Sequence, residues 1–301
     1  MFVLVLNQTN LVNDGQNNKL VYKFPNSIEL KNKFIAVSSI SMFYSWFNIT
    51  QADSNNTFTY TWTSGGVTTT YTVTIPDGLW EIRDINSYLQ FVAIQNGTYW
   101  IDSVGDNVYP FEILVNPNRY SIQINTYLVP SALPVGASVP ANFAGWPTIP
   151  QNPVITIPPL FNIIVGYSAG FATNANLNNA YVPPSPPTAL TNYVSKLPNG
   201  TLSYLSNLAP QVQPNNNVLL SLSNINNPYT QPSSIIYSLN PRVNIGEQIY
   251  EFPPNFMWNR LIDGTYSELR LSLLGTNLRP LTINDPNMTI LLTIKDAGEL
   301  I

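Results

Sequence analysis

The sequence predicts an all-β protein: a single jelly-roll β-sandwich with one short helix and a Pro-rich, loop-dominated insertion. Many short runs alternate apolar and polar residues and are bounded by Asn, Pro and Gly, as strands are. Only one segment has helical spacing. The stretch from Tyr120 to Pro241 holds 18 of the 26 prolines. Eight or more strands with long connections favour a jelly roll over an immunoglobulin-like fold.

The first long strand candidate, FIAVSSISMFYSWFN, begins at Phe34 and is apolar at both even and odd positions. Side chains in a strand alternate between two faces, so Tyr44 and Trp46 are expected on one face and Phe43 and Phe47 on the other. One face can lie on a core. We expect the other to be covered by a neighbouring subunit or by the insertion.

A hairpin and the helix are expected next. From Thr57 to Ile75, aromatic residues and threonines alternate around a Gly-Gly pair, which is a strong hairpin signal. The following segment, GLWEIRDINSYLQFVAIQNG, carries apolar residues at helical spacing. Asp84 can cap its start, and the Asn-Gly pair can end it. The sequence therefore predicts one helix of about three turns.

Strands are expected again at residues 109–115 and 120–128, before the composition changes. Between Tyr120 and Pro241 the only charged residue is Lys196. Proline removes a hydrogen-bond donor and fixes φ, so this stretch cannot be continuous central sheet. We predict a discontinuous jelly-roll core of residues 1–128 and 216–301, and an insertion of residues 129–215.

The insertion is expected to be ordered, with short strands such as Phe161 to Val165. A disordered Pro-rich linker is the alternative. Against it stand apolar anchors that linkers lack, namely Trp146, Phe161, Ile163, Ile164, Phe171 and Tyr181.

The strand pattern returns after the insertion. The expected strands read VLLSLSNIN, SSIIYSLNP, QIYEFPP, SELRLSLLG, RPLTIN and MTILLTIK. In ELRLSLLG, Leu269, Leu271 and Leu273 alternate with Glu268 and Arg270, which indicates a half-buried antiparallel strand.

The composition excludes several kinds of chemistry. The chain has no Cys and no His, so Ser-His-Asp triads, Cys nucleophiles and His- or Cys-based zinc sites are excluded. The 12 basic residues are scattered among 16 acidic ones, which argues against direct nucleic-acid binding. Only 9% of residues are charged, so the surface is rich in neutral groups and suited to being covered. No signal peptide and no membrane span are expected.

Carboxylate pairs are the remaining candidates for acid and base catalysis. Glu81 and Asp84 would share one helix face, and a glycosidase needs two such carboxylates at a defined separation, but helix capping explains them better. Asp102 and Asp106, with Asn107, could offer oxygens to calcium, but their spacing fits an ordinary turn.

The charged residues near the terminal strands, Arg260, Asp263 and Glu268, are expected to form solvated or interface ion pairs. We therefore predict no enzymatic activity, no metal and no cofactor.

Six aromatic residues could instead form a sugar-stacking platform, which makes a carbohydrate-binding or receptor-binding module the alternative function. They are Tyr44, Trp46, Phe47, Tyr60, Trp62 and Trp80. Aromatic stripes in strands more often serve as core or as subunit contact. We expect core or contact here.

Four segments together resemble the penton, or minor capsid, protein of virophages and Maverick/polinton-type elements. They are SMFYSWFN, GLWEIRDINSYLQ, SSIIYSLNP and the closing stretch from Phe252 to Lys295, which begins FPPNFMWNRLIDG. The resemblance covers both ends of the chain but not its Pro-rich middle. One departure is Gly275-Thr276-Asn277, where the family pattern has an acidic-Gln pair.

The resemblance implies a structural protein without catalytic residues, an upright jelly roll that forms the pentameric vertex of an icosahedral virion capsid. Its implied partners are four further copies and the neighbouring major capsid protein, with possible host-receptor or glycan contact through the insertion. Synthesis in the host cytoplasm is expected. The predicted core or subunit-contact residues are Phe43, Tyr44, Trp46, Phe47, Trp258 and Leu271.

Overall fold

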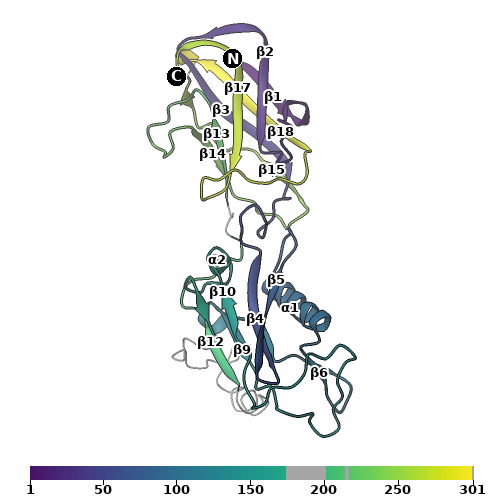
Figure 1. The fold of residues 1–301 in the computed structure, drawn as a ribbon. Helices are drawn as coiled ribbons and strands as arrows, with labels where there is room; N and C mark the ends of the chain where they lie inside the picture. The colour runs from purple at the N-terminus through teal and green to yellow at the C-terminus, as the bar shows by residue number, and fades with distance from the viewer. Residues whose placement is uncertain (174–200, 214–216, 300–301) are drawn as a thin grey trace. The chain divides into compact units, whose positions relative to one another are not determined.

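The computed structural model describes residues 1–173, 201–213 and 217–299, and it divides into two compact units (Figure 1). Unit 1 comprises residues 1–47 and 215–301, and unit 2 comprises residues 48–214. The second unit therefore begins about 80 residues before the predicted insertion boundary at residue 129 and ends beside the predicted boundary at 215. Tyr181, one of the apolar anchors expected in the insertion, and Lys196 lie outside the described residues.

Unit 1 is a sandwich of two antiparallel sheets. Its strands are β1 (Phe2–Asn7), β2 (Lys19–Leu30), β3 (Lys33–Phe43), β13 (Val218–Leu222), β14 (Ile235–Leu239), β15 (Gln248–Glu251), β16 (Asn259–Arg260), β17 (Gly264–Leu274) and β18 (Met288–Asp296). One sheet has the order β1-β18-β3-β15, with β16 also paired to β3, and the other has the order β14-β13-β17-β2.

This order is that of a jelly roll. Without β16, unit 1 has eight strands. The first three along the chain, β1, β2 and β3, precede unit 2, and the fourth to eighth, β13, β14, β15, β17 and β18, follow it. One sheet then reads 1-8-3-6 and the other 5-4-7-2, so all neighbours within a sheet except β13 and β14 are non-consecutive in the chain. The predicted fold class is confirmed, and unit 2 is inserted between the third and fourth strands.

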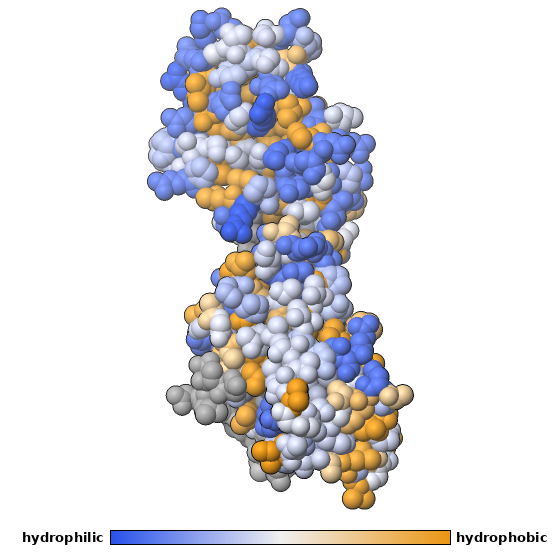
Figure 2. Space-filling model, in the orientation of Figure 1, coloured by the Kyte–Doolittle hydropathy of each residue, from blue (hydrophilic) through white to orange (hydrophobic). Residues whose placement is uncertain are grey.

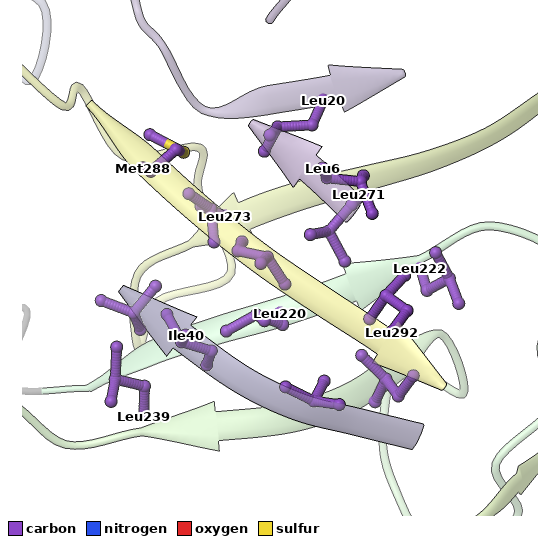
Figure 3. Packing of buried hydrophobic residues seen from close by; sticks show 14 of the residues in the cluster. Leu6, Leu20, Ile40, Leu220, Leu222, Leu239, Leu271, Leu273, Met288 and Leu292 are labelled. Carbon is purple, nitrogen blue, oxygen red and sulfur yellow. The ribbon is translucent and has the colours of Figure 1, made fainter. Parts of the chain in front are cut away.

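The core of unit 1 lies between the two sheets. Figure 3 shows side chains of β3 and β18 directed at those of β13 and β17. Leu269, Leu271 and Leu273 are fully buried there, while Glu268 and Arg270 point outward, as their alternation predicts. The segment RPLTIN forms only isolated bridges, such as Leu274 to Pro280, and the predicted strand there is wrong.

A β-bulge in β3 explains the stretch that looks apolar on two faces. Leu291 of β18 lies opposite Ser39, whereas the next residue, Leu292, lies opposite Val37, so Ser38 is the extra residue. The Ser38 hydroxyl donates a hydrogen bond of 3.1 Å to the Leu291 carbonyl. The extra residue reverses the alternation, so the expectation that one even and one odd face run through the whole strand is wrong. Beyond the bulge, Tyr44 and Trp46 are buried while Phe43 and Phe47 are partly exposed, as their alternation predicts.

On both sides of the bulge the same face of β3 meets the core. Ile35 and Val37 before it, and Ile40 and Met42 after it, all belong to one buried cluster. The core face of the strand is therefore apolar throughout, whereas on the other face Ser39 and Ser41 interrupt the apolar residues Ala36 and Phe43.

Unit 2 has its own core beneath several small sheets. Its strands are β4 (Thr57–Ser64), β5 (Val67–Thr74), β6 (Trp100–Ile101), β7 (Asn107–Val108), β8 (Phe111–Asn116), β9 (Ser121–Thr126), β10 (Ile155–Ile157), β11 (Phe171–Ala172) and β12 (Leu202–Leu205), and its helices are α1 (Ile82–Asn96) and α2 (Phe161–Val165). The sheet orders are β11-β10-β4-β5, β12-β9-β8 and β6-β7.

The hairpin and the helix form where the sequence predicts them. Gly65 and Gly66 both have positive φ, as a two-residue hairpin turn requires, and they join β4 to β5. Helix α1 buries Ile85 and Leu89 against the core of unit 2 and ends at Gly97, which is left-handed. Both elements belong to unit 2, whereas the prediction placed them in the jelly-roll core.

The segment Phe161 to Val165 is helix α2, and the predicted strand there is wrong. Phe161 and Ile164 are buried three residues apart on one helical face, together with Val165. Gly166 ends the helix at a φ of 73°. A five-residue apolar run carries no period long enough to separate strand from helix.

Candidate assembly surfaces

The six predicted core or contact residues fall into two groups. Tyr44, Trp46 and Leu271 belong to the buried cluster of unit 1, with Trp46 only 1% exposed. Phe43, Phe47 and Trp258 are partly exposed. These three remain candidates for subunit contact, whereas the first three are core.

The aromatic platform expected for a carbohydrate-binding module does not form. Tyr44 and Trp46 pack in the core of unit 1, Tyr60 in the core of unit 2, and Trp62 in a smaller buried cluster. Buried rings cannot stack on a sugar. Only Phe47 and Trp80 keep partial exposure among the six.

The carboxylate pairs make structural hydrogen bonds. Asp84 accepts a bond of 3.3 Å from the Glu81 backbone N–H at the start of α1, in a capping box. Asp102 accepts bonds of 2.9 Å from the backbone N–H groups of Val104 and Asp106, which closes an ordinary turn. The Glu81–Asp84 pair therefore caps a helix and the Asp102–Asp106 pair closes a turn, as the sequence predicts.

The charged residues near the terminal strands form surface pairs. Arg260 lies 3.3 Å from Asp263, and the Arg270 Nε donates a bond of 2.7 Å to Glu268. All four side chains keep solvent exposure. In the described part of the chain no group of three or more acidic side chains could hold a metal ion. Within that part, no helix is long and apolar enough to cross a membrane.

The two outward faces of the sandwich differ in charge. On the β2–β17 face, Lys19 and Lys23 lie opposite Ser272 and Glu268, and Arg270 lies between them. This is a solvated face with ion pairs.

The outward-facing side chains of β1, β18 and β3 form an uncharged surface that extends from Asn7 to the position before Lys295. It contains the aligned residues Val3, Thr293 and Ala36, then Val5, Leu291 and Ser39, then Asn7, Thr289 and Ser41. Val3 and Val5 are 48% and 46% exposed. An edge strand with exposed valines and no charge is poorly protected against pairing and suits a covered surface.

An apolar groove of about 810 Å³ lies at the opposite edge of the sandwich. Its walls come from β14 and from the segment between β15 and β16, and include Ile235, Tyr237, Pro253, Met257 and Trp258. None of the described residues that line it is charged. Met257 is 62% exposed. The FPPNFMW motif of the sequence resemblance forms one wall of this groove.

A hydrogen bond closes the sandwich beside the groove. The Tyr237 hydroxyl, on edge strand β14, donates a bond of 2.7 Å to the Glu251 carboxylate on edge strand β15. Burial, together with the bond and the charge of Glu251, raises the pKa of Tyr237 to about 12. This pair holds the two edge strands together at the groove.

Sequence reasoning missed most of these exposed residues. The segment MFVLVLN, which carries Val3 and Val5, was considered only as a signal peptide and is not among the predicted strands. In addition, nothing in a strand's alternation shows which outward face lacks a solvent-adapted charge. The signal available was the absence of Lys and Glu from MFVLVLN, in contrast to β2 and β17.

Unit 2 carries a separate exposed apolar patch. In Figure 2, hydrophobic residues gather over the loops near β6. Val104 and Val135 are 79% and 102% exposed, and Leu133 is 45% exposed. Their loops are joined by the bridge between Ile101 and Ser138.

All of the chain's net charge of −4 arises in residues 48–214, which carry three basic and seven acidic residues.

Comparison with known proteins gives structural similarities only. No family model matches the chain, and no curated protein matches it. The crystal structure of the mavirus penton protein is similar at 7% identity, over 97% of this chain and 96% of that one, with a TM-score of 0.42. The cryo-EM structure of the Sputnik virophage is similar at 10% identity, over 99% of this chain and 98% of that one, with a TM-score of 0.36. Both similarities extend over nearly the whole chain.

Proposed function

We propose that this chain is a structural capsid protein and that five copies form the vertex of an icosahedral particle. The observation that carries the proposal is the pair of uncharged, partly exposed surfaces on the two edges of a jelly-roll unit. Surfaces of this kind stabilise permanent contacts, because apolar area removed from water contributes about 25 cal/mol per Å². The motif order of the sequence resemblance supports the same role.

The proposal does not include a chemical step. The Glu81–Asp84 and Asp102–Asp106 pairs already serve a helix start and a turn, and the aromatic platform of the alternative function is divided among three cores. A neighbouring major capsid protein, a virion location, synthesis in the host cytoplasm, and receptor or glycan contact through unit 2 remain predictions of the resemblance.

Size-exclusion chromatography with light scattering tests the proposal. The purified chain is expected at five times its mass of 33.5 kDa at micromolar concentration. A monomer that persists alone, and also after mixing with the major capsid protein of the same particle, would contradict a vertex role. Tight binding of the monomer to a glycan array would then favour the alternative module.

A further inference from the structure

The two uncharged surfaces lie on opposite edges of the same sandwich. In the sheet order β1-β18-β3-β15, strand β1 is one edge and β15 the other. In the second sheet, β14 is the edge bonded to β15 through Tyr237 and Glu251. The exposed valines of β1 and the groove beside β14 therefore belong to opposite edges of one unit.

This arrangement fits a head-to-tail contact and not a self-complementary one. A ring forms when one surface of each copy binds a different surface of the next copy, and the rotation closes. A two-fold dimer would need one patch that meets itself. We infer that β1 of one copy, through Val3 and Val5, packs on the groove of the next copy, lined by Tyr237, Met257 and Trp258; the inference rests on the proposed pentamer.

The absence of charged side chains in the groove lining favours an uncharged segment as its occupant. The described groove lining holds no charged side chain. The charges that border it are already engaged, because Glu251 accepts the hydrogen bond of Tyr237 and Lys295 lies 4.2 Å from the centre of the Trp258 ring. Burying an ionic segment in the groove would therefore leave its charge poorly paired. Strand β1, FVLVLN, has no charged side chain, whereas β2 and β17 present Lys19, Lys23, Glu268 and Arg270. A second copy therefore offers β1 as its uncharged edge strand.

Cysteine cross-linking tests the contact, because the natural chain contains no Cys. We would mix the single variants Val5→Cys and Met257→Cys and treat them with oxidant or a short bismaleimide. The expected product is a cross-linked dimer from the mixture and none from either variant alone. The double variant should give a ladder that stops at five chains. Val67→Cys, at the exposed start of β5 in unit 2, replaces Val5→Cys as the matched control and should give no product.

The outcomes separate this inference from the proposed function. A pentamer by light scattering without the Val5–Met257 product would overturn the inference and leave the vertex role standing. A Val5–Val5 product would indicate a two-fold contact and would also overturn it. Absence of any pentamer, both for the chain alone and after mixing with the major capsid protein, would contradict the proposed function itself. As a second readout, Val5→Asp and Met257→Asp should each give monomers with unchanged circular dichroism, while Val67→Asp stays pentameric.

Discussion

Deleting Ser38 should destabilise unit 1, because this residue sets which face of β3 meets the core. Without the bulge, alternation would turn either Ile35 and Val37 or Ile40 and Met42 outward. Ile35 and Val37 are 0% and 3% exposed, and burying each contributes about 1.5–3 kcal/mol. The expected loss is therefore about 3–6 kcal/mol, a large fraction of the roughly 5–15 kcal/mol that stabilises a domain.

The matched control for this deletion is Ser38→Ala. It keeps the residue count and loses only the hydrogen bond to Leu291, which costs about 0.5–1.5 kcal/mol. Urea unfolding followed by tryptophan fluorescence measures both variants. Unit 2 has a separate core, and its transition should stay in place as an internal reference. If the deletion is no more destabilising than Ser38→Ala, the bulge does not fix the register and the explanation of this strand is wrong.

Three further predictions concern assembly, pH and packing. Phe47→Asp should abolish assembly or folding while Glu81→Ala preserves both, as light scattering and circular dichroism would show; loss of a hydrolytic activity in Glu81→Ala would revive a glycosidase. The pKa of Tyr237 is about 12 in the folded state and about 10 in the unfolded state. Its contribution to stability is therefore present below pH 10 and lost as the pH rises towards 12. In unfolding measured as a function of pH, Tyr237→Phe should reduce that loss. Gly97→Ala should destabilise unit 2 by more than about 1 kcal/mol, since φ is +65° and a Cβ would come 1.9 Å from the Asn142 carbonyl oxygen; an unchanged unfolding midpoint would contradict this, with Gly105→Ala, a positive-φ glycine with no close neighbour, as the matched control.

Local patterns predicted the elements whose signals are complete within a few residues. The alternation in ELRLSLLG identified the buried face of β17, and the Gly-Gly pair identified the hairpin of β4 and β5. The apolar spacing around Ile85 and Leu89 identified α1, because a helix buries one stripe whatever core it packs on.

The remaining features depend on long-range partners. The bulge at Ser38 exists because β18 pairs with β3 across more than 240 residues, and the local sequence contains no mark of that register. The boundary at Asn48 was missed because the hairpin and α1 carry the same signals in either unit. The proposed contact residues Val3 and Met257 could not be identified from local patterns, because their exposure depends on which surfaces the rest of the fold leaves uncovered. Only the sheet order places them on opposite edges.

Single-particle electron microscopy of the purified chain tests the central claim most directly, because it reports symmetry and the edges that meet. We predict closed rings of fivefold symmetry in which each jelly-roll unit contacts its neighbours through β1 on one side and the β14–β15 groove on the other. Isolated single copies, or two-fold dimers joined through one shared patch, would contradict the claim.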